Sequence, residues 1–151
     1  MKKFCLFILI AFAFFVVAPA AARAQGDAKQ PDVVRDPDME KDSLHNLEVA
    51  RQYFKLRKAY KASLARCEEI IAGNPTFSKI DEVLLIAGES SLRLSENKGK
   101  QSVKTTTDKL RDDARDYLSM LVNNYPDSRF KSEALEALKD LGGPKAKDSK
   151  Q

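Results

Sequence analysis

The chain has 151 residues, with 26 Lys and Arg against 22 Asp and Glu, one His, two Cys and no Trp. This length holds one ordinary domain and excludes a large multidomain enzyme. Charged residues at 32% and hydrophobic ones at 43% are typical of a globular protein that faces water, and one His with two Cys leaves little material for a metal site.

The first 24 residues have the pattern of a secretory signal peptide. A basic start, Met1–Lys3, precedes a continuous apolar run over Phe4–Val17, and the small pair Ala22 and Ala24 follows. The run is shorter than the roughly 20 residues of a membrane-spanning helix. We therefore predict cleavage between Ala24 and Gln25 and export to the periplasm. A segment that stays uncleaved and anchors the chain in the inner membrane is the alternative.

Removal of this segment changes the charge and the cysteine content. Three of the 26 basic residues and no acid lie in it, so residues 25–151 have a formal charge of +1. Nucleic acid is therefore not an expected partner. Cys5 lies in the apolar run without a small-residue lipobox before it, which argues against lipid attachment. Cys67 is then the one remaining thiol, and it cannot form an internal disulfide.

Polar segments border and interrupt a helical region. Residues 25–43 contain two Pro, six acids and three bases, which predicts a disordered acidic linker. Residues 142–151 begin with Gly-Gly-Pro, a helix stop, and predict a disordered basic tail. Residues 95–107 have no core residue beyond Val103 and predict a flexible insert. The folded domain is expected over residues 44–141.

Apolar residues recur with helical spacing five times in this domain. Spacing of i, i+3 or i+4, and i+7 predicts five amphipathic helices and no long strand. The third segment, Val83–Ala87, is apolar almost all round, so its helix should be the most buried. Pro75 and Pro126 end the second and fourth helices. The stripes are Leu44, Leu47, Ala50 and Phe54; Tyr60, Leu64, Cys67 and Ile71; Val83 to Ala87 with Leu92; Leu110, Ala114, Tyr117 or Leu118, Leu121 and Tyr125; and Phe130, Ala134, Leu138 and Leu141.

The two halves of the domain repeat one pattern. A small residue, two large ones and a Pro follow each other at the same intervals, with a period of 51 residues. In each half the Pro leads into another helical segment. Internal repeats of this kind indicate stacked helical hairpins. The matched residues are Ser63, Cys67, Ile70 and Pro75 in the first copy, and Ala114, Leu118, Leu121 and Pro126 in the second.

This pattern resembles tetratricopeptide repeats (TPR), in particular those of BamD-like outer-membrane assembly lipoproteins and related periplasmic TPR proteins. The resemblance depends on Tyr60–Cys67 with Pro75 in the first copy, and on Asn124–Ser128 with Glu133–Leu135 in the second. It covers about residues 44–141. It implies an all-α fold, a short right-handed stack of antiparallel TPR-like helical hairpins with about five helices.

The resemblance also implies a non-catalytic function. The protein would be an exported module for protein–protein interaction, an accessory or scaffold in envelope or outer-membrane assembly. It would hold a protein or peptide partner and need no cofactor, metal or small-molecule substrate. In the family, the first helix of each hairpin lines the concave surface. The corresponding partner-binding residues are Glu48, Gln52, Lys55, Glu89, Leu92 and Arg93.

A basic segment gives the alternative function. Six bases and no acid lie between Arg51 and Arg66, interleaved with Tyr53, Phe54 and Tyr60. Such a patch could make the chain a membrane-surface scaffold that binds anionic lipid or an acidic partner. The competing interpretation is a solvated face whose aromatic rings point to the core. The bases are Arg51, Lys55, Arg57, Lys58, Lys61 and Arg66.

Catalytic groups are not expected. His45 has acids nearby but no converging set of ligands, so we predict a surface residue. Cys67 lies on an apolar stripe and is predicted to be a buried small hydrophobe. Asp112, Asp113 and Asp116 lie among bases on one helix edge, which predicts solvated ion pairs. A small hydrolase is therefore the least supported function.

Overall fold

The computed structural model describes residues 35–146, of which 70% are helical. No strand occurs in that range, so the predicted all-α fold is confirmed. A short π-helical turn, η1, continues the first helix. The elements are α1 (Pro37–Gln52), η1 (Tyr53–Arg57), α2 (Tyr60–Gly73), α3 (Ile80–Ser95), α4 (Thr107–Asn124) and α5 (Lys131–Lys139).

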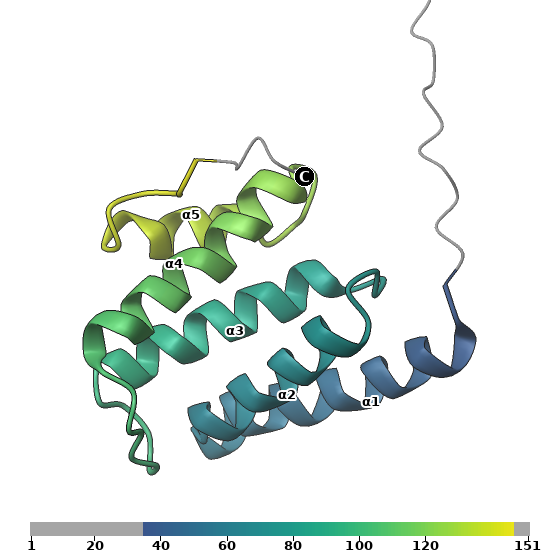
Figure 1. Cartoon of the computed structure of the whole chain (residues 1–151), viewed down its shortest axis with the longest axis horizontal. Coiled ribbons are helices and arrows are strands. Elements are labelled where there is room, and N and C mark those ends of the chain that lie inside the picture. Colours follow the sequence, from purple (N-terminus) through teal and green to yellow (C-terminus); the bar gives the residue numbers. More distant parts are fainter. Residues whose placement is uncertain (1–34, 147–151) are drawn as a thin grey trace, which may run out of the picture. The chain divides into compact units, whose positions relative to one another are not determined.

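The helices form a stack of antiparallel hairpins. Helices α1 and α2 make the first hairpin and α3 and α4 the second, while α5 folds back on α4 (Figure 1). Helix α3 packs against both α2 and α4 and so joins the two hairpins. This arrangement confirms the predicted TPR-like stack of five helices.

Helix α3 is the most buried helix, as its apolar sequence predicts. Every residue from Glu82 to Gly88 is buried. Its Val83 and Ala87 pack with residues of the first hairpin, while Leu84 and Leu85 pack with residues of α4 and α5. The two core clusters therefore meet on this helix. The first includes Leu47, Ala50, Cys67, Ile70 and Phe77, and the second includes Leu118, Leu121, Ala134 and Leu138.

The first helix begins seven residues before the sequence predicts, so the linker predicted over residues 25–43 is wrong from Pro37 onward. The Asp36 carboxylate accepts hydrogen bonds from the backbone N–H groups of Asp38 and Met39, at 2.8 and 3.3 Å. This is an N-terminal cap, and a proline in the first turn is compatible with a helix start. Asp36, Asp38 and Glu40, three of the acids that suggest disorder, are thus favourable charges at a helix N-terminus. Residues 25–34 lie outside the described range.

Replacing Asp36 with Ala should lower the free energy of unfolding by about 1 kcal/mol, because the cap satisfies two N–H groups that have no partner within the helix. Urea denaturation followed by circular dichroism measures the change. Asp42→Ala is the control, since Asp42 is exposed on the same helix and does not cap it. Equal stability of the two variants would contradict the assignment of the cap.

The connection between α3 and α4, residues 96–106, lies against the start of α2. A Cβ atom at Gly99 would be 2.9 Å from the Lys58 carbonyl oxygen and 2.9 Å from the Tyr60 ring. The Ala62 N–H donates to Oε1 of Gln101 at 3.3 Å. The segment predicted as an insert therefore contacts the first hairpin, and its flexibility stays a prediction.

The beginning of the predicted disordered tail folds back on α4, so that prediction is wrong for residues 142–146. The Nε atom of Arg115 donates to the Gly143 carbonyl at 2.7 Å. The Lys145 N–H donates to Oγ of Ser119 at 2.8 Å, and Asn123 donates to the Lys145 carbonyl at 2.9 Å. The side chains that bind the tail all come from α4. The sequence of the tail alone therefore does not predict these contacts. Residues 147–151 lie outside the described range.

The predicted signal segment, with its cleavage site between Ala24 and Gln25, also lies outside the described residues. Within residues 35–146, no helix is long and apolar enough to cross a membrane.

Candidate partner-binding face

An ion pair joins α1 to α3. Nε and Nη2 of Arg51 donate to the two carboxylate oxygens of Glu82 at 2.6 and 2.7 Å. Nη2 of Arg129, from the turn before α5, lies 3.7 Å from the same carboxylate. Three charges thus link the first hairpin, the second hairpin and the approach to the last helix. Two-point contact of this kind also fixes the orientation of the guanidinium group.

The surroundings of Glu82 keep it ionised. Glu82 is 8% exposed, and burial alone would raise the pKa of its carboxyl group. The hydrogen bonds and charge of Arg51, with the charges of Arg129 and Lys79, lower this pKa below its ordinary value of 4.5. Hydrogen bonding to Glu82 raises the pKa of Arg51. A carboxylate held in this way is a fixed charge at neutral pH and a poor general acid.

Three predicted partner-binding residues lie beside this ion pair on the first hairpin. Glu48 and Gln52 are exposed on α1, and Lys55 is exposed on η1. The charge of Glu48 acts on Arg51. Helical spacing puts all three next to the Arg51 side of the helix, because residues three or four apart share a face. They form one polar surface, which we call the α1 face.

The predicted residues on α3 are less accessible. Nη2 of Arg93 lies 3.1 Å from Glu89 and its Nη1 lies 3.8 Å from Glu96. Leu92, which lies between Glu89 and Arg93 in the sequence, is half-buried. Among residues 35–146, no hydrogen bond or ion pair joins this group to the α1 face. The two groups lie on different helices, one on α1 and η1 and the other on α3.

The predicted basic patch is reduced by ion pairs. Arg51 is paired with Glu82, and Arg66 lies 2.6 Å from Glu69. The guanidinium group of Arg57 lies 5.6 Å from the centre of the Tyr53 ring. In the described part of the chain, no carboxylate lies within ion-pair distance of the patch bases that remain. These are Lys55, Arg57, Lys58 and Lys61, all exposed.

The aromatic residues between these bases are half-buried. The rings of Phe54 and Tyr60 meet edge to face with 5.3 Å between their centres, and Phe54 packs against the first core cluster. Tyr53 is half-buried beneath the cation of Arg57. The interpretation that the aromatics face the core therefore holds for Phe54, while Tyr53 belongs to the basic surface.

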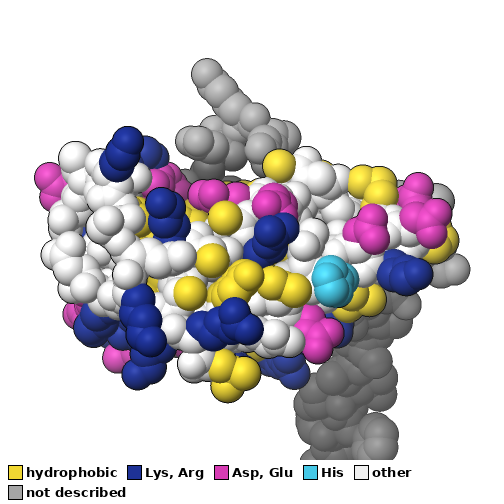
Figure 2. All heavy atoms as spheres, turned by 90° about the horizontal axis from the view of Figure 1, so that it is seen from below, with side chains coloured by type: hydrophobic (Ala, Val, Ile, Leu, Met, Phe, Trp, Pro, Cys, Tyr) yellow, Lys and Arg dark blue, Asp and Glu magenta, His cyan; other side chains and the backbone are white. Residues whose placement is uncertain are grey.

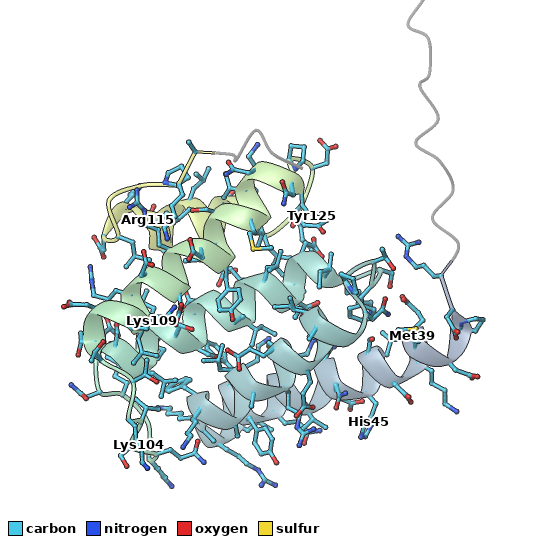
Figure 3. The ribbon with its side chains drawn as sticks, viewed as in Figure 1. Met39, His45, Lys104, Lys109, Arg115 and Tyr125 are labelled. Atoms are coloured by element: carbon cyan, nitrogen blue, oxygen red, sulfur yellow. The ribbon has the colours of Figure 1, made fainter. Side chains whose placement is uncertain are left out.

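The residues that could perform chemistry have structural or solvated positions. His45 lies at the outer edge of α1 (Figure 3) and is exposed. Lys145 lies 2.7 Å from Asp112 and also pairs with Asp116, and Lys109 pairs with Asp113. The Lys109–Asp113 pair agrees with the predicted pairing along the helix, whereas Asp112 and Asp116 pair with Lys145, which follows α5. No group of three or more His, Cys, Asp or Glu in residues 35–146 could hold a metal ion.

The thiol of Cys67 is completely buried. Burial, together with the charges of Glu68 and Glu82, raises its pKa to about 12. At pH 8 only about one thiol in 10,000 would then be a thiolate, the nucleophilic form. This environment suits a small apolar core residue, as predicted.

We expect the peptide that contains Cys67 to stay unmodified when the native protein is treated with iodoacetamide at pH 8, and to be alkylated completely in urea. Peptide mass spectrometry reads this residue independently of Cys5. Equal alkylation rates in buffer and in urea would contradict the buried position.

A small cavity of about 190 Å³ lies between the start of α1 and the end of α2. Its volume is below the 300–1,000 Å³ of typical small-molecule pockets. No residue of the α1 face lines it. The lining residues are Met39, Asp42, Ser43, Asn46, Glu69, Ile70, Gly73 and Asn74.

Sequence reasoning did not single out Glu82 or Arg129. One signal was present: Glu82 directly precedes the apolar run Val83–Ala87 on the helix predicted to be most buried. A buried carboxylate needs a cation, since an unpaired buried charge is strongly unfavourable. That argument predicts a basic partner but does not identify Arg51, which is 31 residues away.

Comparison with known proteins identifies one family. The model of the family YfiO, described as "Outer membrane lipoprotein", matches residues 37–147. The match begins at the first residue of α1 and includes all five helices. No curated protein and no solved structure matches the chain.

Proposed function

Because this chain belongs to the YfiO family of outer membrane lipoproteins, we propose that it acts as a non-catalytic protein-interaction module in assembly of the bacterial outer membrane. The family match confirms the resemblance to BamD-like TPR proteins. BamD-like proteins act through protein partners. The family match also supports a location in the cell envelope for this chain.

The α1 face is the main observation behind this proposal. Glu48, Gln52 and Lys55 expose polar groups of both signs next to the rigid pair of Arg51 and Glu82. Helical-repeat proteins commonly bind partners on a surface that runs across successive hairpins. A peptide or protein segment with charges of both signs would suit this face.

The Glu89–Arg93 pair would extend the binding surface onto α3. This pair is already formed in the protein alone, 3.1 Å apart. A partner that binds there would need to compete with the existing pair or contact its outer side. We therefore expect the α1 face to provide most of the affinity and the α3 group to provide orientation.

Substitution of Lys55 and Arg93 with Glu tests the proposal. We expect the double variant to lose capture of its envelope partner in crosslinked pull-downs from intact cells, with an unchanged circular dichroism spectrum. Lys41→Glu with Lys139→Glu is the control, because it makes the same charge change at two other exposed lysines. Partner capture at the wild-type level by the Lys55 and Arg93 variant would refute the proposed surface.

Export by the predicted signal peptide is part of the same proposal. N-terminal sequencing of the protein recovered from the periplasm should then begin at Gln25. Recovery of the intact N-terminus with the inner-membrane fraction would favour the anchored alternative.

A further inference from the structure

Leu56 is the most exposed large hydrophobic side chain of the described residues. It is 80% exposed, whereas the next, Met39, is 44% exposed. It lies in η1, where the first hairpin turns from α1 into α2. Single exposed apolar residues are common on protein surfaces. This one differs because the backbone holds it at a turn and bases surround it in the sequence.

The backbone of this turn is fixed by hydrogen bonds. The N–H groups of Lys58 and Ala59 both donate to the Tyr53 carbonyl oxygen. Lys58 has a φ of 50°, a left-handed conformation that ends the π-helical turn. Short π-helical turns are rare in proteins, and those that occur are often found at functional sites. The protruding position of Leu56 is therefore part of the folded hairpin.

Basic side chains accompany Leu56 on the same turn. Arg57 and Lys58 follow it directly, and Lys61 lies in the first turn of α2. The Arg57 cation lies near the half-buried ring of Tyr53. Amphipathic aromatic rings and long basic side chains are both suited to the boundary between water and lipid.

A second segment adds charge to this surface. The α3–α4 connection packs against Lys58 and Tyr60 through Gly99, so its lysines come to the same end of the molecule. Lys100 and Lys104 are exposed there, and Figure 3 shows Lys104 at the outer end of this connection. Its one acid, Glu96, is paired with Arg93 and Lys98. Figure 2 shows Lys and Arg side chains gathered at this end of the face that α1 lines.

We propose that this surface docks on an anionic phospholipid bilayer and inserts Leu56 among the lipids. We call it the hairpin tip, and it consists of Leu56, Arg57, Lys58, Lys61, Lys100 and Lys104. It does not depend on the proposed partner face.

A bilayer suits the hairpin tip better than an acidic protein does. A side chain that protrudes this far would need a matching apolar pocket on a protein, whereas a bilayer offers an apolar medium at every point of its surface. Long basic side chains around it can reach lipid phosphates while their aliphatic stems stay near the apolar region. Charge alone would explain attraction to either partner, and Leu56 is the feature that favours lipid.

A single tryptophan at position 56 tests insertion, because the chain contains no Trp. We expect the emission of the Leu56→Trp variant of the full chain to shift to shorter wavelength on phosphatidylglycerol vesicles and to be quenched by brominated lipids. Met120→Trp is the control, since Met120 is 43% exposed on α4. Association through the N-terminal apolar segment alone would leave both positions equally unquenched and would overturn the proposal.

Two further variants separate the apolar and charged contributions. The Leu56→Ser variant contains no Trp, so its docking is measured by how well it competes with the Leu56→Trp variant for vesicles and reduces the quenching of that variant. We expect Leu56→Ser to dock about tenfold more weakly than the wild type. Lys100→Gln with Lys104→Gln should weaken docking about tenfold and reduce its sensitivity to salt, while Lys41→Gln with Lys139→Gln leaves it unchanged. A spectral shift at position 56 with polyglutamate but not with anionic vesicles would identify an acidic protein site and contradict membrane docking.

Discussion

Replacing Glu82 with Gln should lower the free energy of unfolding by about 2 kcal/mol at pH 7. The substitution leaves the Arg51 guanidinium group next to a neutral amide in a partly buried position. Breaking a fully buried ion pair typically costs 3–5 kcal/mol. Arg51 is 32% exposed, so water compensates for part of that loss. Urea denaturation of the variant and the wild type measures the difference.

The effect should depend on pH with a defined sign. The pKa of Glu82 is lower in the folded protein than its ordinary value of 4.5. The stability from this carboxylate is therefore fully present above about pH 5 and is lost as pH falls through the lower folded pKa. We expect the stability difference between wild type and Glu82→Gln to shrink below about pH 4. A difference that is as large at pH 3 as at pH 7 would contradict an ionised Glu82.

Glu69→Gln is the matched control for the ion pair. Glu69 and Arg66 lie 2.6 Å apart, the same distance as Arg51 and Glu82, but both side chains are well exposed. Exposed pairs contribute less than about 1 kcal/mol. The comparison therefore separates the effect of burial from the effect of hydrogen-bond length.

Replacing Gly88 with Val should destabilise the protein by about 3 kcal/mol. Even a single Cβ atom at this position would lie 2.6 Å from Cγ of Leu118 and 3.3 Å from the carbonyl oxygen of Ala114. These atoms belong to α4, so a larger side chain would push apart the two helices of the second hairpin. Overpacking of this kind typically costs 1–3 kcal/mol or more. Thermal unfolding followed by circular dichroism measures the loss.

Two variants test the reason for this effect. Gly73→Val is the control, because Gly73 is also helical and nothing lies within 4 Å of a Cβ atom there. It should change the stability by less than about 1 kcal/mol. Adding Leu118→Ala to Gly88→Val removes the clashing side chain, so the double variant should be less destabilised than the sum of the single ones. Additive losses would show that Gly88 is needed for another reason.

The fold could be predicted from the sequence because helix formation and hairpin order depend on local patterns. Leu47, Ala50, Ala134 and Leu138 are all fully buried, as their helical spacing predicts. Leu44, predicted on the same stripe, is instead 39% exposed. The buried face of α1 passes through Ser43, whose hydroxyl bonds to the Met39 carbonyl and accepts from Asn74.

The features that local patterns missed depend on distant residues. The basic neighbours of Arg51 in the sequence predict a basic patch, whereas its partner Glu82 lies on another helix. The Gly and Pro residues before Lys145 predict a tail, whereas Asp112 and Ser119 of α4 contact Lys145 in the structure. No periodic pattern in a single segment contains this information. The proposed partner face combines the family resemblance with the exposure of Glu48, Gln52 and Lys55.

Site-specific photo-crosslinking in intact cells tests the partner face most directly. A photoreactive residue at Gln52 lies on the α1 face, whereas one at Ala65 lies at an exposed position of α2 outside it. We predict that position 52 forms a discrete adduct with an envelope protein, that Lys55→Glu with Arg93→Glu removes this adduct, and that position 65 forms none. An adduct at position 65 with none at position 52 would contradict the proposed face.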